Sequence, residues 1–400
     1  MAPEFPAVYL KPRKALPFFS RHPWVFEGAI GRVDGPASPG DAVRVMSAEG
    51  KFVAWGLFNP ESSIRVRLYS WDPDAPLDET FWEQQIGRAM GLRRRLFAGT
   101  PVLQACRLVS SEADGLSGLT VDWFGDWLLV QWTSFALARR EELIIRLLQS
   151  ELAPKGIWRR TEKGIADIEG LEIRDGLVAG EMPPRPILIE ENGLQFAVDV
   201  VEGQKTGFYF DQRDNRLAAS RYARGARVLD TFCYSGGFGL AALKHGSASE
   251  VVAVDASAGA IALAQRNAEL NGLADRIRFQ QGDSYKQLEL LHEQGEKFGM
   301  VVLDPPKMTR TRGGIEKAIR GYHSLNKLGL SVLEPGGILV TCSCSGLVDR
   351  TLFEQMIANV ALDTGRRIRI LESRGAAPDH PLNPHCPENA YLKCCICYVE

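Results

Sequence analysis

The residues of this sequence that could do chemistry stand directly after short apolar runs in its C-terminal half. Carboxylates follow four of these runs, a glycine-rich stretch continues from the first, and two cysteines follow a fifth. The residues at these points are Asp230, Phe232, Ser235, Gly236, Gly237, Asp255, Asp283, Asp304, Pro305, Cys342 and Cys344. Carboxylates accept hydrogen bonds from hydroxyl, amine and ammonium groups, and a thiolate can attack an electrophilic carbon.

The elements that must position these residues belong to the last block of the chain, residues 191–400. It alternates short apolar runs with amphipathic segments, which predicts an α/β domain built on a doubly wound parallel sheet. We expect strands at Arg227–Leu229, Val251–Val254, Ile277–Gln280, Met300–Leu303, Ile338–Thr341, Arg367–Leu371 and Cys394–Val399, and helices at Ala256–Leu270 and Ile315–Leu333. Ligands of such sheets bind beyond the carboxyl ends of the strands, where the residues above would lie.

Two kinds of cofactor compete for the glycine-rich stretch. Gly237-x-Gly239-x-x-Ala242 matches the dinucleotide fingerprint, but a carboxylate at Asp230 would repel a pyrophosphate. S-adenosylmethionine has no phosphate and carries an ammonium and a sulfonium, so acids after four strands favour it. Asp255 could then accept from both ribose hydroxyls and Asp283 from the adenine amine. Each acid taken alone also fits a helix N-cap.

The thiols suit attack on a pyrimidine. Carbon 5 of a pyrimidine is a poor nucleophile until a thiolate adds to carbon 6, so covalent catalysis would make its methylation feasible. Cys342 and Cys344 follow the fifth strand, and Asp304-Pro305-Pro306 forms a stiff loop poor in N–H donors after the fourth. The alternative is that both cysteines are packed at a strand end.

The remaining chain divides at two proline-rich stretches. Residues 1–72 are predicted to form a small β barrel or sandwich, and residues 73–190 a middle α+β domain. The expected elements are strands at Ala42–Met46, Phe52–Leu57 and Ile64–Leu68, a helix at Phe81–Leu96, a hairpin of Leu119–Phe124 with Trp127–Trp132, and a helix at Arg139–Leu152. Nothing in the middle block looks catalytic.

Composition limits the class of protein. The 400 residues carry 47 Lys and Arg against 49 Asp and Glu, so nucleic-acid binding would need local basic patches. No apolar run approaches the ~20 residues that span a bilayer, and the start lacks the features of a secretory signal. The eight cysteines lack the paired spacing of zinc sites. We therefore expect a cytoplasmic protein with reduced thiols and without a metal.

Four motifs together carry a family resemblance. They are residues 206–213 (Thr-Gly-Phe-Tyr-Phe-Asp-Gln-Arg), the Asp230–Gly239 stretch, Asp304-Pro305-Pro306-Lys307, and residues 341–345 (Thr-Cys-Ser-Cys-Ser). They resemble the RlmI-type family of class I S-adenosylmethionine-dependent methyltransferases, which make 5-methylcytosine in large-subunit ribosomal RNA. Residues 20–26 and 40–71 are similar to the family's N-terminal PUA domain, an RNA-binding β barrel, and residues 112–116 resemble its middle domain.

The resemblance assigns roles to residues of this chain. It makes Cys344 the nucleophile and Asp304 the group that hydrogen-bonds the cytosine edge, while Thr206, Phe208 and Tyr209 would line the cofactor pocket. Wider relatives carry a second Cys after Pro-Pro that helps release the product. This chain has Lys307 there, which leaves Cys342 as a candidate substitute.

A base inside a duplex cannot present carbon 6 to a thiol, so the target cytosine would be single-stranded or flipped out. Basic stretches at Lys11–Arg21, Arg93–Arg95 and Lys307–Lys327 are candidates for phosphate contacts. Each of them also fits a solvated face.

Other functions stay open at this point. One is methylation of a different atom, such as a guanine nitrogen, without a covalent step. Another is a non-catalytic RNA-binding protein, and a third is a dehydrogenase that binds a nicotinamide. A homodimer is also left open.

Overall fold

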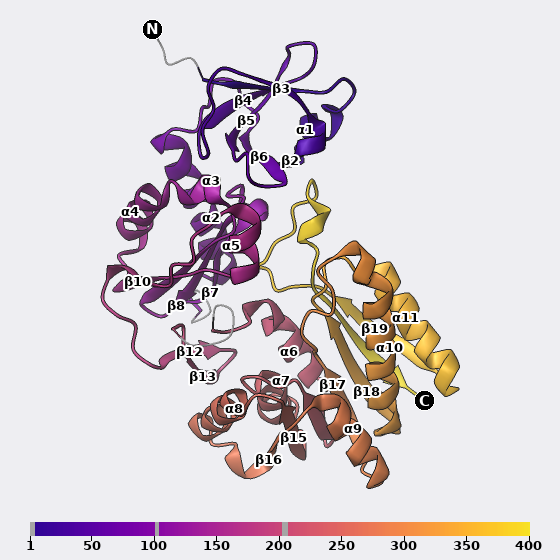
Figure 1. The fold of residues 1–400 in the computed structure, drawn as a ribbon. Helices are drawn as coiled ribbons and strands as arrows, with labels where there is room; N and C mark the ends of the chain where they lie inside the picture. Colours follow the sequence, from indigo (N-terminus) through magenta and orange to yellow (C-terminus); the bar gives the residue numbers. More distant parts are fainter. Residues whose placement is uncertain (1–4, 101–103, 202–206) are drawn as a thin grey trace. The chain divides into compact units, whose positions relative to one another are not determined.

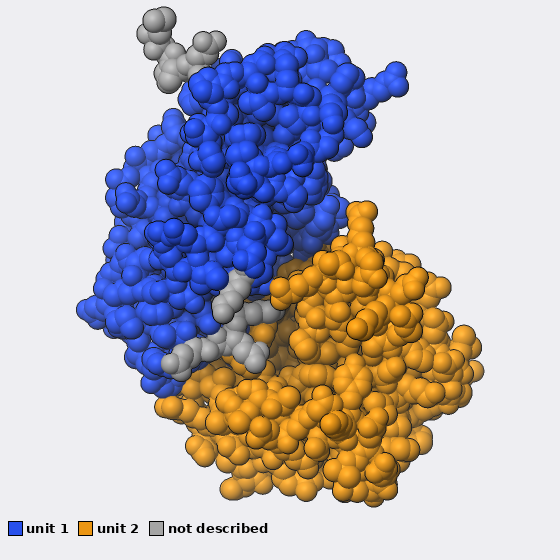
Figure 2. All heavy atoms as spheres, viewed as in Figure 1, with its two compact units in different colours: residues 1–187, 198–208, 379–389 blue, residues 188–197, 209–378, 390–400 orange. Residues whose placement is uncertain are grey.

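The computed structural model describes residues 5–100, 104–201 and 207–400, which Figure 1 shows as a ribbon. The chain forms two compact units, coloured separately in Figure 2. Unit 1 comprises residues 1–187, 198–208 and 379–389, and unit 2 comprises residues 188–197, 209–378 and 390–400. Among the described residues, no helix combines the length and apolar character that a membrane span needs.

Unit 1 begins with a sheet of six short strands in the order β2-β6-β5-β4-β1-β3. Its strands are β1 (Ala7–Leu10), β2 (Trp24–Phe26), β3 (Ile30–Asp34), β4 (Ala42–Met46), β5 (Phe52–Phe58) and β6 (Ile64–Ser70), with the short helix α1 (Leu16–Phe19) after β1. Alternate valines and leucines point inward and form a closed apolar core. The β-rich N-terminal block predicted from the sequence is confirmed.

A second sheet of unit 1 has the order β11-β10-β9-β8-β7. It consists of β7 (Ala105–Ser110), β8 (Leu119–Phe124), β9 (Trp127–Trp132), β10 (Gly156–Arg160) and β11 (Gly176–Gly180), with helices α2 (Glu79–Phe97), α3 (Phe135–Ala138), α4 (Glu141–Leu152) and α5 (Lys163–Glu169). Apolar side chains of α2 and α4 pack on the sheet in one core. The predicted hairpin and both predicted helices are present, so the middle block is α+β.

A buried ionic cluster joins the two sheets of unit 1. Arg67 on β6 is 6% exposed. Its guanidinium donates to Glu112 at 3.2 Å and to Glu169 at 3.0 Å. Burial opposes ionisation of Glu112, but Arg67 and the hydroxyl of Ser117 outweigh it and lower the pKa of that carboxyl. The indole Nε1 of Trp24 also donates to Glu112, at 3.0 Å. Buried carboxylates need such partners, because an unpaired buried charge is costly.

Unit 2 is built on a seven-stranded sheet in the order β16-β15-β14-β17-β18-β20-β19. The strands are β14 (Arg227–Thr231), β15 (Glu250–Asp255), β16 (Ile277–Gln281), β17 (Phe298–Leu303), β18 (Leu333–Ser343), β19 (Ile368–Arg374) and β20 (Lys393–Val399). All seven predicted strands exist. The doubly wound sheet is confirmed, but one strand departs from the predicted parallel direction, since β20 pairs antiparallel with both β18 and β19.

Helices cover both faces of this sheet. Figure 1 shows α6 (Arg213–Ser220), α7 (Gly237–Lys244) and α8 (Ala258–Leu270) on one side, and α9 (Ser284–Glu293), α10 (Ile315–Ser331) and α11 (Arg350–Thr364) on the other. Side chains of α9, α10 and α11 share an apolar core with β14, β15, β17 and β18. A two-stranded hairpin, β12 (Ile187–Glu191) with β13 (Leu194–Val198), precedes the domain.

Local capping defines where several helices begin. Asp78, Ser257, Asp283 and Asp349 each stand at an N-cap and accept a backbone N–H from the first turn of α2, α8, α9 and α11, respectively. Such caps satisfy N–H groups that have no partner inside the helix. In unit 2, Ser257, Asp283 and Asp349 fix the strand-to-helix turns that follow β15, β16 and β18.

Candidate active site

The loop between β14 and α7 has a strained backbone. Phe232, Tyr234 and Gly236 have positive φ angles of 58°, 47° and 77°. For residues other than glycine this conformation costs roughly 1–3 kcal/mol and persists only where the surroundings impose it. Here the Asp255 carboxylate accepts the Tyr234 N–H at 3.0 Å. Strain of this kind concentrates at ligand sites, which fits the predicted role of the loop.

The start of α7 packs too closely for side chains. A Cβ at Gly237 would meet the Cδ of Arg216 at 2.7 Å, and one at Gly239 would meet a methyl of Val251 at 2.9 Å. Ser235 is buried, and its carbonyl accepts from the Nδ2 of Asn267 at 3.0 Å. Gly237 and Gly239, which the motif predicted, are therefore needed because the backbone of α7 lies close to the side chains of Arg216 and Val251.

Asp230 is the buried acid of this edge, with 1% of its surface exposed. Its Oδ2 accepts the Gly239 N–H at 2.9 Å. Burial, with a smaller contribution from the charges of Asp304 and Asp255, raises the pKa of Asp230 to about 7 against the opposing hydrogen bond from Gly239. The three carboxylates thus act on each other, and a cationic ligand would relieve their repulsion.

Two of the other predicted acids, Asp255 and Asp283, also accept hydrogen bonds from the local backbone. Asp255 accepts from Tyr234 with Oδ2 and from the Ser257 N–H with Oδ1, at 2.9 Å. A carboxylate has about four lone-pair sites, so these bonds leave capacity for ribose hydroxyls. Asp283 is exposed and caps α9 through Lys286 N–H at 3.1 Å. The N-cap alternative considered for each acid applies to Asp283, and its contact with adenine stays a prediction.

Cys344 lies just beyond the end of β18 and is partly exposed. Its Sγ is 3.9 Å from the carbonyl oxygen of Pro305. This contact brings together the thiol and the Asp-Pro-Pro loop, which are 39 residues apart in the chain. Asp304 is half-buried and Pro305 is buried at the end of β17.

The segment around Cys344 is clamped by buried hydroxyls. The hydroxyl of Tyr322 on α10 lies 3.0 Å from the Oγ of Ser343 and 2.9 Å from the Oγ of Ser345. The Ser345 Oγ also accepts the Met308 N–H at 3.0 Å. Tyr322, Ser343 and Ser345 have no measurable exposure. The backbone on both sides of the thiol is therefore fixed against the loop that carries Asp304.

A buried lysine stands beside this segment. Lys393 is 2% exposed, and its Nζ donates to the carbonyls of Ser345 and Tyr391, both at 2.7 Å. Burial lowers the pKa of Lys393 to about 8, and the strongest opposing influence is the charge of Cys344. A lysine with carbonyl partners keeps its positive charge available to a nearby thiolate.

Cys342 occupies a different environment. It is fully buried within β18, opposite Cys394 of the neighbouring strand. Burial raises the pKa of the Cys342 thiol well above its ordinary value, and Cys394 and Asp304 raise it further. Its thiol is thus held neutral inside the sheet, and this geometry gives no support to the prediction that Cys342 takes over product release. Cys394, Cys395 and Cys397 are buried in β20, as expected for a terminal strand.

Thr206, Phe208 and Tyr209, which precede α6, were predicted to line the cofactor pocket, and that role stays a prediction. Tyr209 packs edge-to-face on Tyr234 with ring centroids 5.3 Å apart. Burial raises the pKa of Tyr209, and the charges of Asp304 and Cys344 contribute, so Tyr209 belongs to the same cluster. Phe208 is buried in unit 1. Thr206 lies outside the described residues.

Sequence reasoning missed Lys393, Tyr322 and Tyr234. Lys393 offered a signal, because a lysine at the head of an otherwise apolar strand is unusual. Tyr322 was expected only as a core residue of its helix, and Tyr234 only as part of the glycine-rich stretch. Their roles depend on which loops the sheet brings together.

Burial removes one residue from the predicted basic patches and leaves another exposed. Arg93 has no measurable exposure and pairs with Asp114 at 2.6 Å, so the prediction of a phosphate-binding patch at Arg93–Arg95 is wrong for Arg93. In the Lys307–Lys327 stretch, Arg320 lies 3.8 Å from Glu316, and both side chains are largely exposed. Such a pair contributes little and leaves Arg320 accessible.

One cluster in unit 1 bears on the expectation of no metal site. His22, Cys386 and Glu388 each bring one potential ligand atom within 4.8 Å of the others. The Nδ1 of His22 accepts the Trp24 N–H at 3.3 Å, which places the proton of the neutral ring on Nε2. That nitrogen lies 3.5 Å from the carboxylate of Glu388. The Sγ of Cys386 also donates to the Glu388 carboxylate at 3.5 Å. The absence of a metal stays a prediction.

Comparison with known proteins identifies the family. Residues 8–71 match a model of a PUA-like domain, and residues 113–381 match a model of S-adenosylmethionine-dependent methyltransferases. A protein of Photobacterium profundum named ribosomal RNA large subunit methyltransferase I is 40% identical over 98% of this chain and 99% of its own length. The chain belongs to this methyltransferase family. A member from Tolumonas auensis is 42% identical over 96% of this chain and 97% of its own length.

Solved structures agree with the methyltransferase fold. Two of them cover 98% of this chain and 99% of their own, at 20% identity, with TM-scores of 0.84 and 0.83. The first is a methyltransferase in complex with S-adenosylhomocysteine, and the second is an S-adenosylmethionine-dependent methyltransferase from Streptococcus mutans. The protein is an S-adenosylmethionine-dependent enzyme. The carboxylates of Asp230, Asp255 and Asp304 suit this cationic cofactor and disfavour phosphates.

Proposed function

We propose that this methyltransferase forms 5-methylcytosine in large-subunit ribosomal RNA through a covalent adduct of Cys344. The single observation that carries the proposal is the position of Cys344, partly exposed and in contact with the Asp304-Pro305 loop at the acid-lined edge. The relatives' printed name supports ribosomal RNA as the substrate. The choice of cytosine carbon 5 rests on the thiol, because only a poorly nucleophilic carbon needs one.

The residues that would hold the cofactor are Asp230, Asp255, Asp283 and the loop from Phe232 to Gly237. S-adenosylmethionine supplies an electrophilic methyl group when it is bound there. The acids fit its ammonium and ribose, and Gly237 and Gly239 let the start of α7 pack closely against Arg216 and Val251, which fixes the loop.

The chain's own residues then perform the covalent step. The Cys344 thiolate forms a bond to carbon 6, and the electron pair of the carbon 5–carbon 6 double bond makes carbon 5 nucleophilic. Asp304 accepts from the exocyclic amine of the base and holds its edge. After carbon 5 is methylated, water takes its proton, and the electron pair of that carbon–hydrogen bond restores the double bond, breaks the sulfur–carbon 6 bond and returns Cys344 as a thiolate.

The RNA must present its cytosine outside a duplex, because the thiol approaches carbon 6 from the face of the ring. We expect the PUA-like domain of unit 1 to contact the RNA, and exposed Lys14 and Arg21 lie on either side of α1 in this domain.

The decisive experiment replaces Cys344 by alanine, with Cys342→Ala as the matched control. We expect C344A to bind S-adenosylmethionine normally by calorimetry and to form no 5-methylcytosine by nucleoside mass spectrometry. C342A should keep both properties, because its thiol is buried. RNA carrying 5-fluorocytosine should trap a covalent complex with the wild type, since fluorine cannot leave as a proton does.

Full activity of C344A would contradict covalent catalysis. If its product were a methylated guanine, the enzyme would act on another atom. Failure of the wild type to bind S-adenosylmethionine at millimolar concentration would remove the enzymatic proposal altogether.

A further inference from the structure

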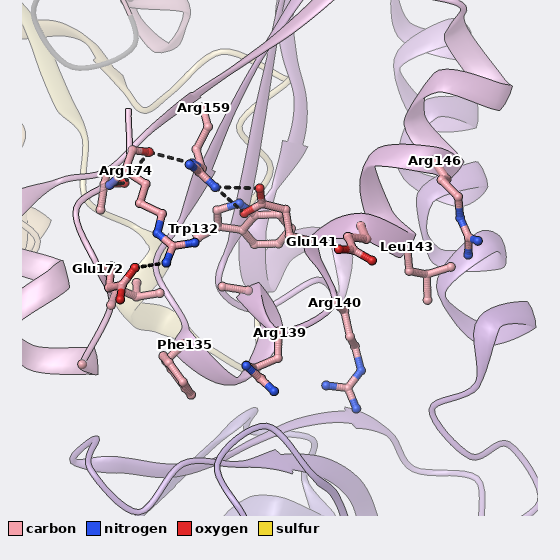
Figure 3. Close-up of a pocket in the computed structure, with 15 residues that line it drawn as sticks. Trp132, Phe135, Arg139, Arg140, Glu141, Leu143, Arg146, Arg159, Glu172 and Arg174 are labelled. Atoms are coloured by element: carbon pink, nitrogen blue, oxygen red, sulfur yellow. Dashed lines mark hydrogen bonds and ion pairs between the residues drawn. The ribbon is translucent and has the colours of Figure 1, made fainter. Parts of the chain in front are cut away.

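A pocket of about 880 Å³ opens in the middle part of unit 1, away from the residues discussed above. Its walls come from the end of β9, from α3 and the start of α4, from β10, and from residues 170–174 (Figure 3). The volume lies in the range of ligand sites, which is about 300–1,000 Å³. Sequence reasoning assigned no role to this part of the chain.

The lining of the pocket is strongly charged. Eight of its fifteen lining residues carry a charge: Arg139, Arg140, Glu141, Glu142, Arg146, Arg159, Glu172 and Arg174. Pockets for drug-sized molecules are mostly apolar, with few polar groups. Five arginines against three glutamates instead suit an anionic partner that lies across an open surface.

Two of the arginines form the ordered wall of the pocket. Arg159 binds both carboxylate oxygens of Glu141, at 2.7 and 3.0 Å, and its Nε donates to the Arg174 carbonyl at 2.6 Å. Arg174 pairs with Glu172. Figure 3 shows these contacts on one side of the pocket. Their charges are largely neutralised within the protein.

The charge of Arg140 is not balanced in the same way. Its Nη1 donates to the carbonyls of Gly40 at 2.8 Å and Ala136 at 3.2 Å, and its guanidinium lies 5.7 Å from the Trp82 ring. Burial lowers the pKa of Arg140, which nevertheless stays a cation. Its hydrogen bonds are to carbonyl oxygens, and the charge of Asp41 also acts on it, so Arg140 adds a partly offset positive charge to the pocket.

Arg139 and Arg146 are the accessible cations. Arg139 is exposed, its stem packs against Gly40, and among the described residues no ion pair neutralises it. Arg146 lies 3.3 Å from Glu79, with both side chains about two-thirds exposed, and such pairs are weak. The half-buried ring of Phe135 projects on the same side as Arg139 in Figure 3.

We propose that this pocket binds the backbone of a single-stranded stretch of the substrate RNA. Arg139 and Arg146 contact phosphate oxygens, Arg140 adds positive potential, and Phe135 provides a ring against which a base stacks. Cations beside an accessible aromatic ring are the combination that single-stranded nucleic acid uses, and a free phosphate would need only the cations. The inference rests on the proposed function, which supplies the RNA.

The test is the salt dependence of RNA binding by the full-length protein. The probe is a labelled, short single-stranded RNA of mixed sequence, and the variant is the double substitution Arg139→Gln and Arg146→Gln, which keeps the aliphatic stems. Each lost phosphate contact lowers the slope of log affinity against log salt by about 0.7. Two lost contacts mean that, between about 50 and about 200 mM salt, the wild type loses about sevenfold more affinity than the variant.

The matched control is Arg367→Gln with Arg369→Gln. These two arginines are 72% and 54% exposed and pair with Glu400, so the control removes the same charge from unit 2. Its slope should equal that of the wild type. Phe135→Ala should weaken binding at every salt concentration without changing the slope.

Equal slopes in the wild type and in the Arg139/Arg146 variant would overturn the inference, provided that thermal unfolding and S-adenosylmethionine binding are unchanged. Binding of inorganic phosphate that depends on Arg139 and Arg146 but leaves the affinity for RNA unaltered would also overturn the inference. The pocket would then be a site for free anions only. If the wild type bound no RNA, the proposed function would fail together with the inference, whereas the first two outcomes leave the proposed function standing.

Discussion

Replacing Lys393 by methionine should make Cys344 a poorer nucleophile. The Nζ of Lys393 donates to the carbonyl of Ser345, the residue after Cys344. The charge of Cys344 is the strongest influence that favours the ammonium form of Lys393. Interaction between two charges is mutual, so the ammonium must favour the Cys344 thiolate. Methionine keeps most of the buried volume and removes the charge.

The size of the effect follows from burial and charge. An ammonium group near a thiolate favours the ionised form, and the partial exposure of Cys344 screens that interaction. We therefore expect removal of the charge to slow alkylation of Cys344 about tenfold at neutral pH, which corresponds to roughly 1.4 kcal/mol. Lys393 loses its own proton as the pH rises through about 8. The wild type should therefore react faster than the variant below pH 8, and the two rates should converge above it.

Alkylation by iodoacetamide measures this without RNA or turnover. The thiolate is the reactive form, so the rate at which the Cys344 peptide gains mass reports the thiolate fraction at each pH. The other seven cysteines are buried and should react slowly. Lys297→Met is the matched control, because Lys297 also donates to a backbone carbonyl, that of Ser331, on an exposed surface.

The reasoning is refuted if the Lys393→Met protein, with unaltered thermal unfolding and cofactor binding, alkylates Cys344 at the wild-type rate between pH 6 and pH 8. Restored reactivity in Lys393→Arg would support a role for the charge. A loss that Lys297→Met shares would indicate a general effect of removing a lysine.

Three further outcomes are expected. Because burial raises the pKa of Asp230 to about 7 and a cationic ligand favours its ionised form, calorimetry should show S-adenosylmethionine affinity rising about tenfold from pH 6 to pH 8, and Asp230→Asn should abolish this dependence. Arg67→Met leaves Glu112 and Glu169 buried without their cation and should cost about 3–5 kcal/mol in urea unfolding; a loss below about 1 kcal/mol would contradict the account of this cluster. In Gly239→Ala the new methyl would lie 3.3 Å from an oxygen of Asp230, so titration with S-adenosylmethionine should show weaker binding. An intact affinity would contradict the inference that α7 packs tightly against Asp230.

Much of the fold was predictable because it depends on local patterns. Short apolar runs separated by turn residues predicted the seven strands of the large sheet in unit 2 and five strands of unit 1, and the hairpin Leu119–Phe124 with Trp127–Trp132 has the predicted bounds. The strands β1, β2, β3, β7, β10 and β11 were not predicted. The antiparallel placement of β20 was not predictable, because strand direction depends on the path of the chain between strands and not on the residues within them.

The sequence allowed us to predict which residues of the candidate site follow the ends of strands. Asp230, Asp255 and Asp304 lie together because parallel strands end at one edge, which the alternation of elements already implies. Equivalent positions in the sequence do not guarantee equivalent exposure, however. Cys342 and Cys344 are two residues apart, yet only Cys344 lies beyond the end of β18 and reaches the surface.

The sequence by itself therefore determined which residue types stand at the ends of the strands, since hydrophobic periodicity and turn chemistry act over a few residues. Only the tertiary structure decided which charges are free. It buried Arg93 against Asp114, set Lys393 beside Cys344, and left Arg139 exposed in a pocket. The reason is that burial and charge pairing depend on contacts between segments far apart in the chain, and these contacts exist only once the sheets have packed.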